Sequence, residues 1–369
     1  MRVIVIGSGI VGASAAYQLV KRNHDVVLID NARKGAATDA GAGIVSPWVT
    51  QRGEDWYHIA RRGALFYPDL LANLEEDGEN SEGYKKVGAL CVSSNPEELD
   101  ELERLVRAKS EKASEIGNIQ RLSSKDARKL FPPLHEDLQA VFLSGAARVD
   151  GRMLRDAMIR AAKRHKLRLV GGEASLIKEA NSIVGVKVKE KVIYADRVII
   201  AAGAWVPNLL KPIGVDIKVE PQRGQIVHIT LPNTDTSNWP IILPQSNHYM
   251  LAFDDSRIVA GATRETGSGF SYQITAGGVH EVLSEALRVA PGLADGQLKE
   301  VRIGFRPMGP DILPLLGTLD NFSEVIVATG LGASGLTMGP FIGSLAADLA
   351  QGLDLDIDQS IFKPERNII

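Results

Sequence analysis

The first thirty residues place an amphipathic segment between two short apolar runs. The apolar runs are Val3 to Ile6 and Val26 to Ile29, and residues 10–21 between them carry apolar side chains at helical spacing. Short apolar runs that flank an amphipathic stretch of this length predict a βαβ unit with parallel strands. The chain is therefore expected to begin as an α/β fold.

The middle of the chain alternates between helical and strand patterns. The stretch from about Glu82 to Pro133 is charged and predicted to be mostly helical, with helices over Pro96 to Lys112 and Ser123 to Leu130. Asp150 is a candidate N-cap for a helix over Met153 to Lys163. A later helix is expected from about Gly277 to Ala290. Strands are predicted at Leu167–Val170, Leu176–Lys178, Ile183–Val188, Val192–Tyr194, Arg197–Ile200, Gln225–Thr230, His248–Phe253 and Ile258–Ala262.

A glycine motif occupies the turn between the first strand and the first helix. It reads Gly7-Ser-Gly9-Ile-Val-Gly12, and the second strand ends on Asp30 about twenty residues later, as a dinucleotide fingerprint requires. The glycines allow a tight turn, close backbone approach to a pyrophosphate and close packing of helix on strand. The helix N-terminus favours the negative charge of the phosphates, and Asp30 is expected to accept hydrogen bonds from a ribose.

Two further segments are rich in small residues. Gly35 to Trp48 contains mostly glycine and alanine where a plain NAD domain would begin another amphipathic helix, which favours backbone closure around a bulky ligand. Val325 to Ala347 carries no charge but contains too many glycines for a membrane-spanning helix. We interpret this segment as a strand, a glycine-rich turn and a helix from Pro340 to Ala350, whose positive end favours an anion.

Composition excludes several classes of protein. The 369 residues suffice for about two domains, and 42 Lys and Arg against 45 Asp and Glu give a formal charge of −3, which offers no general attraction for nucleic acid. Cys91 is the one cysteine, so an intrachain disulfide and a multi-cysteine metal site are excluded, and we expect no metal site. The N-terminal run is too short for a secretory signal, and a cytoplasmic location is expected.

These motifs together resemble the D-amino-acid oxidase superfamily of FAD-dependent oxidoreductases, in the glycine oxidase and D-amino-acid dehydrogenase branch. The resemblance covers essentially the whole chain. It rests on the Gly7–Gly12 turn with Asp30, on the loop from Thr38 to Ile44, on Ala174 and the Ala201–Trp205 strand end, and on Arg306-Pro-Met and the Gly330–Gly339 turn.

The resemblance implies an α/β plus α+β fold. An FAD-binding Rossmann-like domain of the glutathione-reductase type would be formed by residues 1–81, 140–214 and 300–369. An interleaved substrate-binding domain, built on an antiparallel β-sheet, would be formed by residues 82–139 and 215–299.

The resemblance also implies site residues. Arg306 would bind the substrate carboxylate through its planar guanidinium, with a structural salt bridge as the alternative. Tyr249 would place its hydroxyl over the substrate, with simple packing as the alternative. Trp48 would line the pocket or pack in the core. Among the seven histidines, His248 is the one candidate for a site residue. The residues expected to bind the cofactor are Gly7, Gly9, Ile10, Val11, Gly12, Asp30, Asn31, Thr38, Ala42, Gly43, Ile44, Ala174, Gly203, Trp205, Gly304, Arg306, Gly330, Leu331, Gly332, Ala333, Ser334, Gly335, Leu336 and Thr337.

The implied reaction is oxidation of the C–N bond of a small amino acid, namely a D-amino acid, glycine, sarcosine or a proline-like compound. A hydride passes to flavin N5, and water converts the imino acid to a 2-oxo acid and ammonia. The amides of Leu331 to Thr337 would stabilise the negative charge that develops on the flavin. Two departures matter: Ala333 stands where glycine oxidases carry a second basic residue, and Cys91 lies outside the region that attaches flavin covalently in relatives. Noncovalent FAD is therefore expected.

Several alternatives stay open at this point. The chain could be the flavin subunit of a multi-component amine dehydrogenase complex, or an FAD-dependent RNA-modification enzyme, although its charge and 20 aromatic residues argue against RNA. An NAD-dependent dehydrogenase is disfavoured by the C-terminal glycine turn. The expected electron acceptor is oxygen, a quinone or a partner flavoprotein. We expect a homo-oligomer, with no nucleic-acid partner, that is cytoplasmic or peripheral to the inner face of the membrane.

Overall fold

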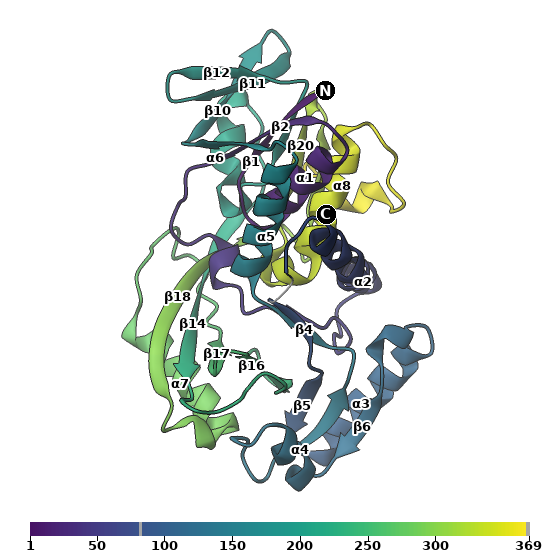
Figure 1. Ribbon diagram of the computed structural model, residues 1–369, viewed down its shortest axis with the longest axis vertical. Helices are drawn as coiled ribbons and strands as arrows, with labels where there is room; N and C mark the ends of the chain where they lie inside the picture. Colours follow the sequence, from purple (N-terminus) through teal and green to yellow (C-terminus); the bar gives the residue numbers. More distant parts are fainter. Residues whose placement is uncertain (81–82, 367–369) are drawn as a thin grey trace.

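The computed structural model describes residues 1–80 and 83–366 and contains two large sheets that lie end to end (Figure 1). Within the described residues the first sheet has six strands and is parallel except at its β19 edge. Its strands, in spatial order, are β19 (Leu315–Leu319), β20 (Phe322–Thr329), β13 (Arg197–Ile200), β1 (Arg2–Ile6), β2 (Asp25–Asp30) and β9 (Arg168–Gly171).

Both faces of the six-stranded sheet are buried, which explains why its strands consist of continuous runs of apolar residues. Val3 and Val5 of β1 belong to a core formed with helices of one layer, whereas Ile4 and Ile6 belong to a second core on the opposite face. Helices that contribute to the first core include α1 (Ile10–Lys21), α2 (Glu54–Glu76), α5 (Gly151–Arg164) and α8 (Gly335–Ala350).

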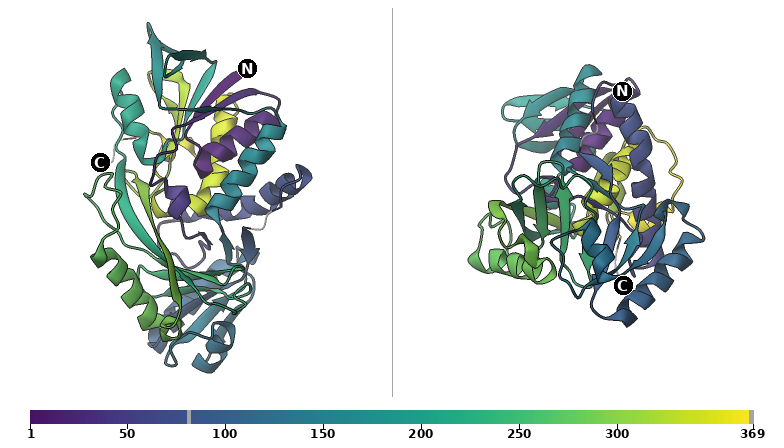
Figure 2. Two further views of the ribbon diagram at one scale, coloured as in Figure 1. Left: turned by 60° about the vertical axis from the view of Figure 1, so that its left-hand side comes forward. Right: turned by 60° about the horizontal axis from the view of Figure 1, so that its bottom comes forward.

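The opposite face of this sheet is covered by a small antiparallel sheet and a short helix. They lie on the side of the sheet away from α1 and α8 in both views of Figure 2. The result is a three-layer arrangement in which the carboxyl ends of β1 and β20 point toward the second large sheet. The covering elements are β10 (Ala174–Glu179), β11 (Ser182–Val188), β12 (Lys191–Tyr194) and α6 (Val206–Leu210).

The second large sheet is antiparallel except for one pair, β15 with β5. Its long strands β14 and β18 pair along their whole length and extend from this sheet toward the first one (Figure 1). In spatial order the described strands are β18 (Gln297–Met308), β14 (Glu220–Thr230), β17 (Arg257–Gly261), β16 (Tyr249–Phe253), β15 (Ile241–Pro244), β5 (Ala89–Ser93), β7 (Gln139–Leu143) and β6 (Ile119–Leu122).

The remaining described elements flank the second sheet or join the two sheets. Helices α3, α4 and α7 lie at its ends (Figure 1). A small sheet of three short strands lies between the two large ones. The bounds are α3 (Pro96–Ser110), α4 (Ser124–Leu130), α7 (Ala276–Val289), β3 (Ile44–Val45), β8 (Ala147–Val149) and β4 (Tyr84–Lys86).

The fold class expected from the sequence is confirmed. Most expected elements agree within one to three residues, and Asp150 caps α5 by accepting hydrogen bonds from the N–H groups of Arg152 and Met153. The stretch from Glu82 to Pro133 is less helical than expected, because β4, β5 and β6 lie in it. None of the helices in the described ranges is both long enough and apolar enough to cross a bilayer.

One expected helix boundary was wrong. The last helix begins at Gly335 rather than at Pro340, so the proline lies inside it. In a helix the backbone N–H of residue 340 would donate to the carbonyl of Leu336, but a proline has no N–H. The hydroxyl of Tyr67 on α2 donates to that carbonyl instead, which lets the helix continue through Pro340.

The domain boundaries stay a prediction. The boundary expected between residues 81 and 82 falls on residues outside the described ranges. Two other boundaries cut through strands, because β7 spans residues 139–143 and β18 spans residues 297–308, and both strands belong to the eight-stranded sheet. We therefore propose that residues 140–143 and 300–308 belong with the substrate-binding part of the chain.

Candidate active site

The glycine turn after β1 is built as a nucleotide-binding turn requires. Gly7 has φ +101°, a conformation that L side chains rarely adopt. A Cβ at Gly12 would lie 1.8 Å from the Gly7 carbonyl oxygen, so helix α1 packs directly on the turn. The N-cap residue of α1 is Gly9, which has no side chain to accept a hydrogen bond from the first turn. Amides of that turn are therefore available to an anion in the adjoining cavity.

Two polar side chains organise the entrance to this turn. Asp30, at the end of β2, accepts hydrogen bonds from the backbone and hydroxyl of Ser8 at 2.6 and 2.8 Å. Both go to Oδ2, whereas Oδ1 accepts one hydrogen bond, from the Ala32 N–H at 2.6 Å, and can accept another from a ribose in the cavity that Asp30 lines. The Thr38 hydroxyl accepts from the Ile10 N–H at 3.0 Å, which fixes the small-residue loop against the start of α1.

The C-terminal glycine turn brings a second helix N-terminus to the same cavity. Leu331, Gly332, Ala333, Gly335 and Leu336 line it. Because α8 begins at Gly335 rather than at Pro340, its positive end lies at the cavity wall itself. The N-termini of α1 and α8 therefore both face the site, and each favours negative charge there.

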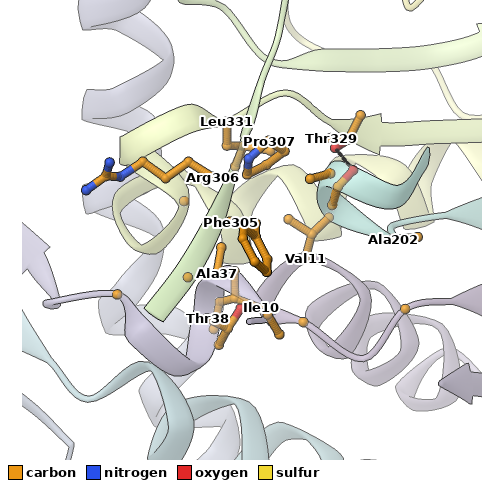
Figure 3. Close-up of a pocket in the computed structure, with 18 of the residues that line it drawn as sticks. Ile10, Val11, Ala37, Thr38, Ala202, Phe305, Arg306, Pro307, Thr329 and Leu331 are labelled. Atoms are coloured by element: carbon orange, nitrogen blue, oxygen red, sulfur yellow. Dashed lines mark hydrogen bonds between the residues drawn. The ribbon is translucent and has the colours of Figure 1, made fainter. Parts of the chain in front are cut away.

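Arg306 and Tyr249 line the cavity from the eight-stranded sheet. The Arg306 side chain extends from β18 in the direction away from Phe305 (Figure 3). Its Nη1 donates to the Thr263 carbonyl at 2.9 Å and to Gln222 Oε1 at 3.1 Å. Within residues 1–80 and 83–366 it contacts no carboxylate, so the structural salt bridge considered as its alternative role is absent from the described chain.

The protonation states of these two residues suit substrate binding. Burial lowers the pKa of Arg306, but an arginine pKa starts so high that the group stays a cation. Burial raises the pKa of Tyr249, and the nearby Arg306 charge offsets only part of that rise. Tyr249 therefore presents a neutral hydroxyl that can donate a hydrogen bond.

Most residues expected to bind the cofactor line this one cavity. Four do not: Gly12 lies behind Gly7, Thr337 donates to the Ile44 carbonyl, and Gly330 and Ser334 lie outside the lining. The expected residues that line it are Gly7, Gly9, Ile10, Val11, Asp30, Asn31, Thr38, Ala42, Gly43, Ile44, Ala174, Gly203, Trp205, Tyr249, Gly304, Arg306, Leu331, Gly332, Ala333, Gly335 and Leu336.

The remaining candidates lie outside the cavity lining. Trp48 is buried in the core under α2 rather than in the site. The ring of His248 faces Glu281 at 3.4 Å, on the side of β16 opposite to Tyr249. Cys91 is buried in β5, and burial raises its pKa to about 12, so it is an unreactive core thiol.

Sequence reasoning missed several lining residues, including Gly224, Asn247, Arg264 and Phe305. Arg264 follows β17 in an ordinary polar stretch, and no local motif marks it. Gly224 lies inside a strand, and an isolated glycine in a strand is a signal of close approach by another group. That signal could have identified Gly224, because the Arg306 guanidinium lies over it.

Comparison with known proteins agrees with the fold and the cavity. Residues 2–349 match the family described as FAD dependent oxidoreductase, DAO. Uncharacterized oxidoreductase YurR of Bacillus subtilis (strain 168) is 47% identical over 363 residues, which cover 98% of each chain. A glycine oxidase of Pseudomonas aeruginosa is 30% identical over 373 residues, again 98% of each chain. The crystal structure of iminodiacetate oxidase (IdaA) from Chelativorans sp. BNC1 has a TM-score of 0.96 and 44% identity, covering 98% of this chain and 99% of that one.

The chain is thus a flavoenzyme of the D-amino-acid oxidase type, with a Rossmann-like nucleotide domain and a sheet-based second domain. It belongs to the DAO family of FAD-dependent oxidoreductases, and FAD is its cofactor. The residues present fit that group, because the α1 N-terminus, Asp30 and the α8 N-terminus line one continuous cavity.

Proposed function

We propose that this enzyme oxidises the carbon–nitrogen bond of a small amino acid or N-substituted glycine whose carboxylate binds Arg306. The observation that carries the proposal is the state of Arg306: it is a half-buried cation that lines the flavin cavity and contacts no carboxylate in the described chain. A buried charge is normally paired, so an anionic ligand is the natural partner of this guanidinium.

The chain's own groups bind and orient the substrate. When bound, FAD accepts a hydride from the substrate α-carbon. Arg306 neutralises the substrate carboxylate, and its bonds to Gln222 and Thr263 hold the guanidinium in one orientation. Tyr249 donates its neutral hydroxyl to the same substrate, and the α8 N-terminus stabilises the negative charge gained on reduction. Water then hydrolyses the imino acid to a 2-oxo acid and ammonia or an amine.

Two of the similar proteins support substrates of the glycine type. One is named a glycine oxidase and the other an iminodiacetate oxidase, and each name denotes oxidation of glycine or of an N-carboxymethyl glycine. We therefore place glycine, sarcosine and iminodiacetate first among the candidates, ahead of D-amino acids and proline-like compounds.

The test is the visible spectrum of the purified holoenzyme during anaerobic addition of glycine, sarcosine, iminodiacetate, D-alanine, and D- and L-proline. Bleaching of the flavin band by at least one of them, with release of the matching 2-oxo acid, is the expected result. Readmission of air then separates oxygen as the acceptor from a quinone or partner protein, according to whether the band returns. A flavin that none of these compounds reduces would contradict the proposal.

A further inference from the structure

Strand register brings Arg264 to the same face of the sheet as Arg306. The residues after β17 continue to pair with β14, since the Thr263 N–H donates to the Gln225 carbonyl at 3.2 Å and the Glu265 N–H donates to the Arg223 carbonyl at 2.9 Å. Successive side chains of a strand point to opposite faces. Thr263 and Glu265 therefore share one face, and Arg264 between them occupies the other.

The same alternation places Arg306 on the Arg264 face. Gly224 lies between Arg223 and Gln225, and it pairs with Gly304, two residues before Arg306 on β18. A Cβ at Gly224 would lie 2.6 Å from Arg306 Nη2, so the guanidinium occupies the space above this glycine. Arg306 also donates to the carbonyl of Thr263, the residue directly before Arg264. The two arginines thus flank one point of the cavity wall, and both line the cavity.

The acidic side chains near the cavity do not neutralise the positive charge of Arg264. Glu265 lies on the opposite face, where Arg223 Nε donates to it at 3.0 Å. The acidic residues among the cavity lining are Asp30 and Glu173, which belong to the nucleotide end, and Glu173 pairs with Arg33 at 2.6 Å. In the described ranges Arg264 forms no ion pair, and its side chain is exposed toward the cavity mouth.

A third arginine adds to this positive charge. Arg52 donates a hydrogen bond to the Ser334 hydroxyl at 3.4 Å, and its guanidinium lies 4.6 Å from the centre of the Trp56 ring. The C-terminal turn and helix α2 therefore both contact this arginine. Burial lowers the pKa of Arg52, and the charge of Arg264 lowers it further. The cavity lining therefore carries Arg306 and Arg264, and Arg52 contacts the C-terminal turn outside that lining.

Resting on the proposed function, we propose that Arg264 binds a second substrate carboxylate, so that the enzyme selects amines with two carboxylates over those with one. One carboxylate requires one guanidinium, and Arg306 already supplies it. Arg264 lines the cavity without an ion-pair partner in the described chain, so a second anionic group of a bound substrate is the chemistry that its guanidinium matches.

The test uses substrates that differ by one carboxylate. Iminodiacetate and sarcosine share the glycine unit and differ in an N-carboxymethyl against an N-methyl group, and D-aspartate and D-alanine are the corresponding pair for a side-chain carboxylate. In the wild-type enzyme we expect the dicarboxylate of at least one pair to have the higher kcat/KM. In Arg264→Met we expect that preference to fall at least tenfold through a higher KM for the dicarboxylate, and Arg264→Lys retains part of it.

Arg288→Met is the matched control, because Arg288 is an exposed arginine on α7 that pairs with Glu285. It is expected to keep the wild-type preference. The flavin spectrum and Tm of each variant check that the protein is folded and loaded. Protection of the holoenzyme against thermal unfolding by succinate, compared with acetate, gives a second measurement, and this difference is expected to vanish in Arg264→Met.

Two results would overturn the inference and leave the proposed function intact. One is a wild-type enzyme whose kcat/KM is higher for the monocarboxylate in both pairs. The other is a dicarboxylate preference that survives in Arg264→Met. Absence of flavin reduction by every amine in the wild type would instead contradict the proposed function itself.

Discussion

Arg306 is a cation held by two neutral oxygen acceptors, and its removal tests the proposed substrate site most directly. We expect Arg306→Ala to lower kcat/KM about 100-fold, or about 2.7 kcal/mol, because a charge-assisted bidentate contact is lost. Arg306→Lys is expected to recover part of this loss, since it keeps the charge but not the planar fork. Steady-state kinetics with the best substrate of the panel measures both.

A matched control lies on the same strand. Arg302 also belongs to β18 but pairs with Glu300 at 2.5 Å, outside the cavity lining. Arg302→Lys is expected to leave kcat/KM within twofold of wild type, and all these variants are expected to keep the flavin absorbance. Equal losses in Arg302→Lys and Arg306→Lys would remove Arg306 from the substrate site.

At this scale the sequence identifies residues that belong to motifs and misses those that only tertiary pairing brings together. Gly7, Asp30 and Arg306 lie in recognisable patterns, and the structure places all three around one cavity. Arg264 is one of 42 basic residues, and it reaches the site only because β17 and β14 pair across about forty residues of chain. No local pattern encodes that pairing, because register depends on contacts between distant segments.

Among the elements, α8 shows why helix boundaries are harder to predict than helix existence. A proline normally marks the first turn of a helix, which is why a start at Pro340 was expected. The structure continues the helix back to Gly335 because Tyr67, 269 residues earlier, donates to the carbonyl that the proline leaves free. A hydrogen bond across that distance has no signature in the local sequence.

This compensation predicts a specific coupling. Tyr67→Phe keeps the ring stacked on Tyr84 but leaves the buried Leu336 carbonyl without a donor, at a cost of about 2 kcal/mol in the free energy of unfolding. Pro340→Ala restores a backbone N–H to the same carbonyl. The cost of Tyr67→Phe is therefore expected to be smaller in the Pro340→Ala background, as urea unfolding of the four proteins in a double-mutant cycle measures. Strictly additive costs would contradict this account of the helix.

For the whole molecule, one buried ion pair joins the two large units. Asp150 caps α5, which packs on the six-stranded sheet, and it accepts a hydrogen bond from Arg257 of β17 in the eight-stranded sheet at 2.9 Å. Burial raises the pKa of Asp150, but the hydrogen bond and charge of Arg257 lower it more, so the pKa lies below its ordinary value. The pair therefore stabilises the folded state above the ordinary carboxyl pKa and loses this effect as pH falls through the lowered one.

We expect Asp150→Asn, which keeps the helix cap, to cost about 2 kcal/mol of unfolding free energy at pH 7. The difference from wild type is expected to shrink below about pH 4, where the wild-type carboxyl becomes protonated. Asp255→Asn removes the other carboxylate of Arg257, which is half exposed, and is expected to cost less than about 1 kcal/mol. A pH-independent difference for Asp150→Asn would show that the ion pair contributes nothing to stability.

The cofactor is a second link between the two units, because one cavity is lined by residues of both. At FAD concentrations about 100-fold above Kd, its binding adds about 2.7 kcal/mol, so its removal is expected to lower Tm by about 3–4 °C in a chain of 369 residues. Thermal unfolding of apoenzyme and holoenzyme measures this difference. FMN lacks the adenosine that Asp30 would bind and is expected to restore less of the lost stability. Identical Tm values for apoenzyme and holoenzyme would contradict the shared cavity.

The order of strands in the six-stranded sheet also bears on how the enzyme is made. β1 pairs with β13, and β13 pairs with β20, so the centre of this sheet joins residues from the beginning, the middle and the end of the chain. Parallel strands so distant in sequence close large loops before their contacts form, which slows folding. During synthesis the glycine turn near residue 7 emerges more than 300 residues before the turn at Gly332 that completes the cavity. A growing chain therefore cannot complete the flavin cavity before the Gly332 turn has emerged, and capture of the cofactor follows synthesis of that turn.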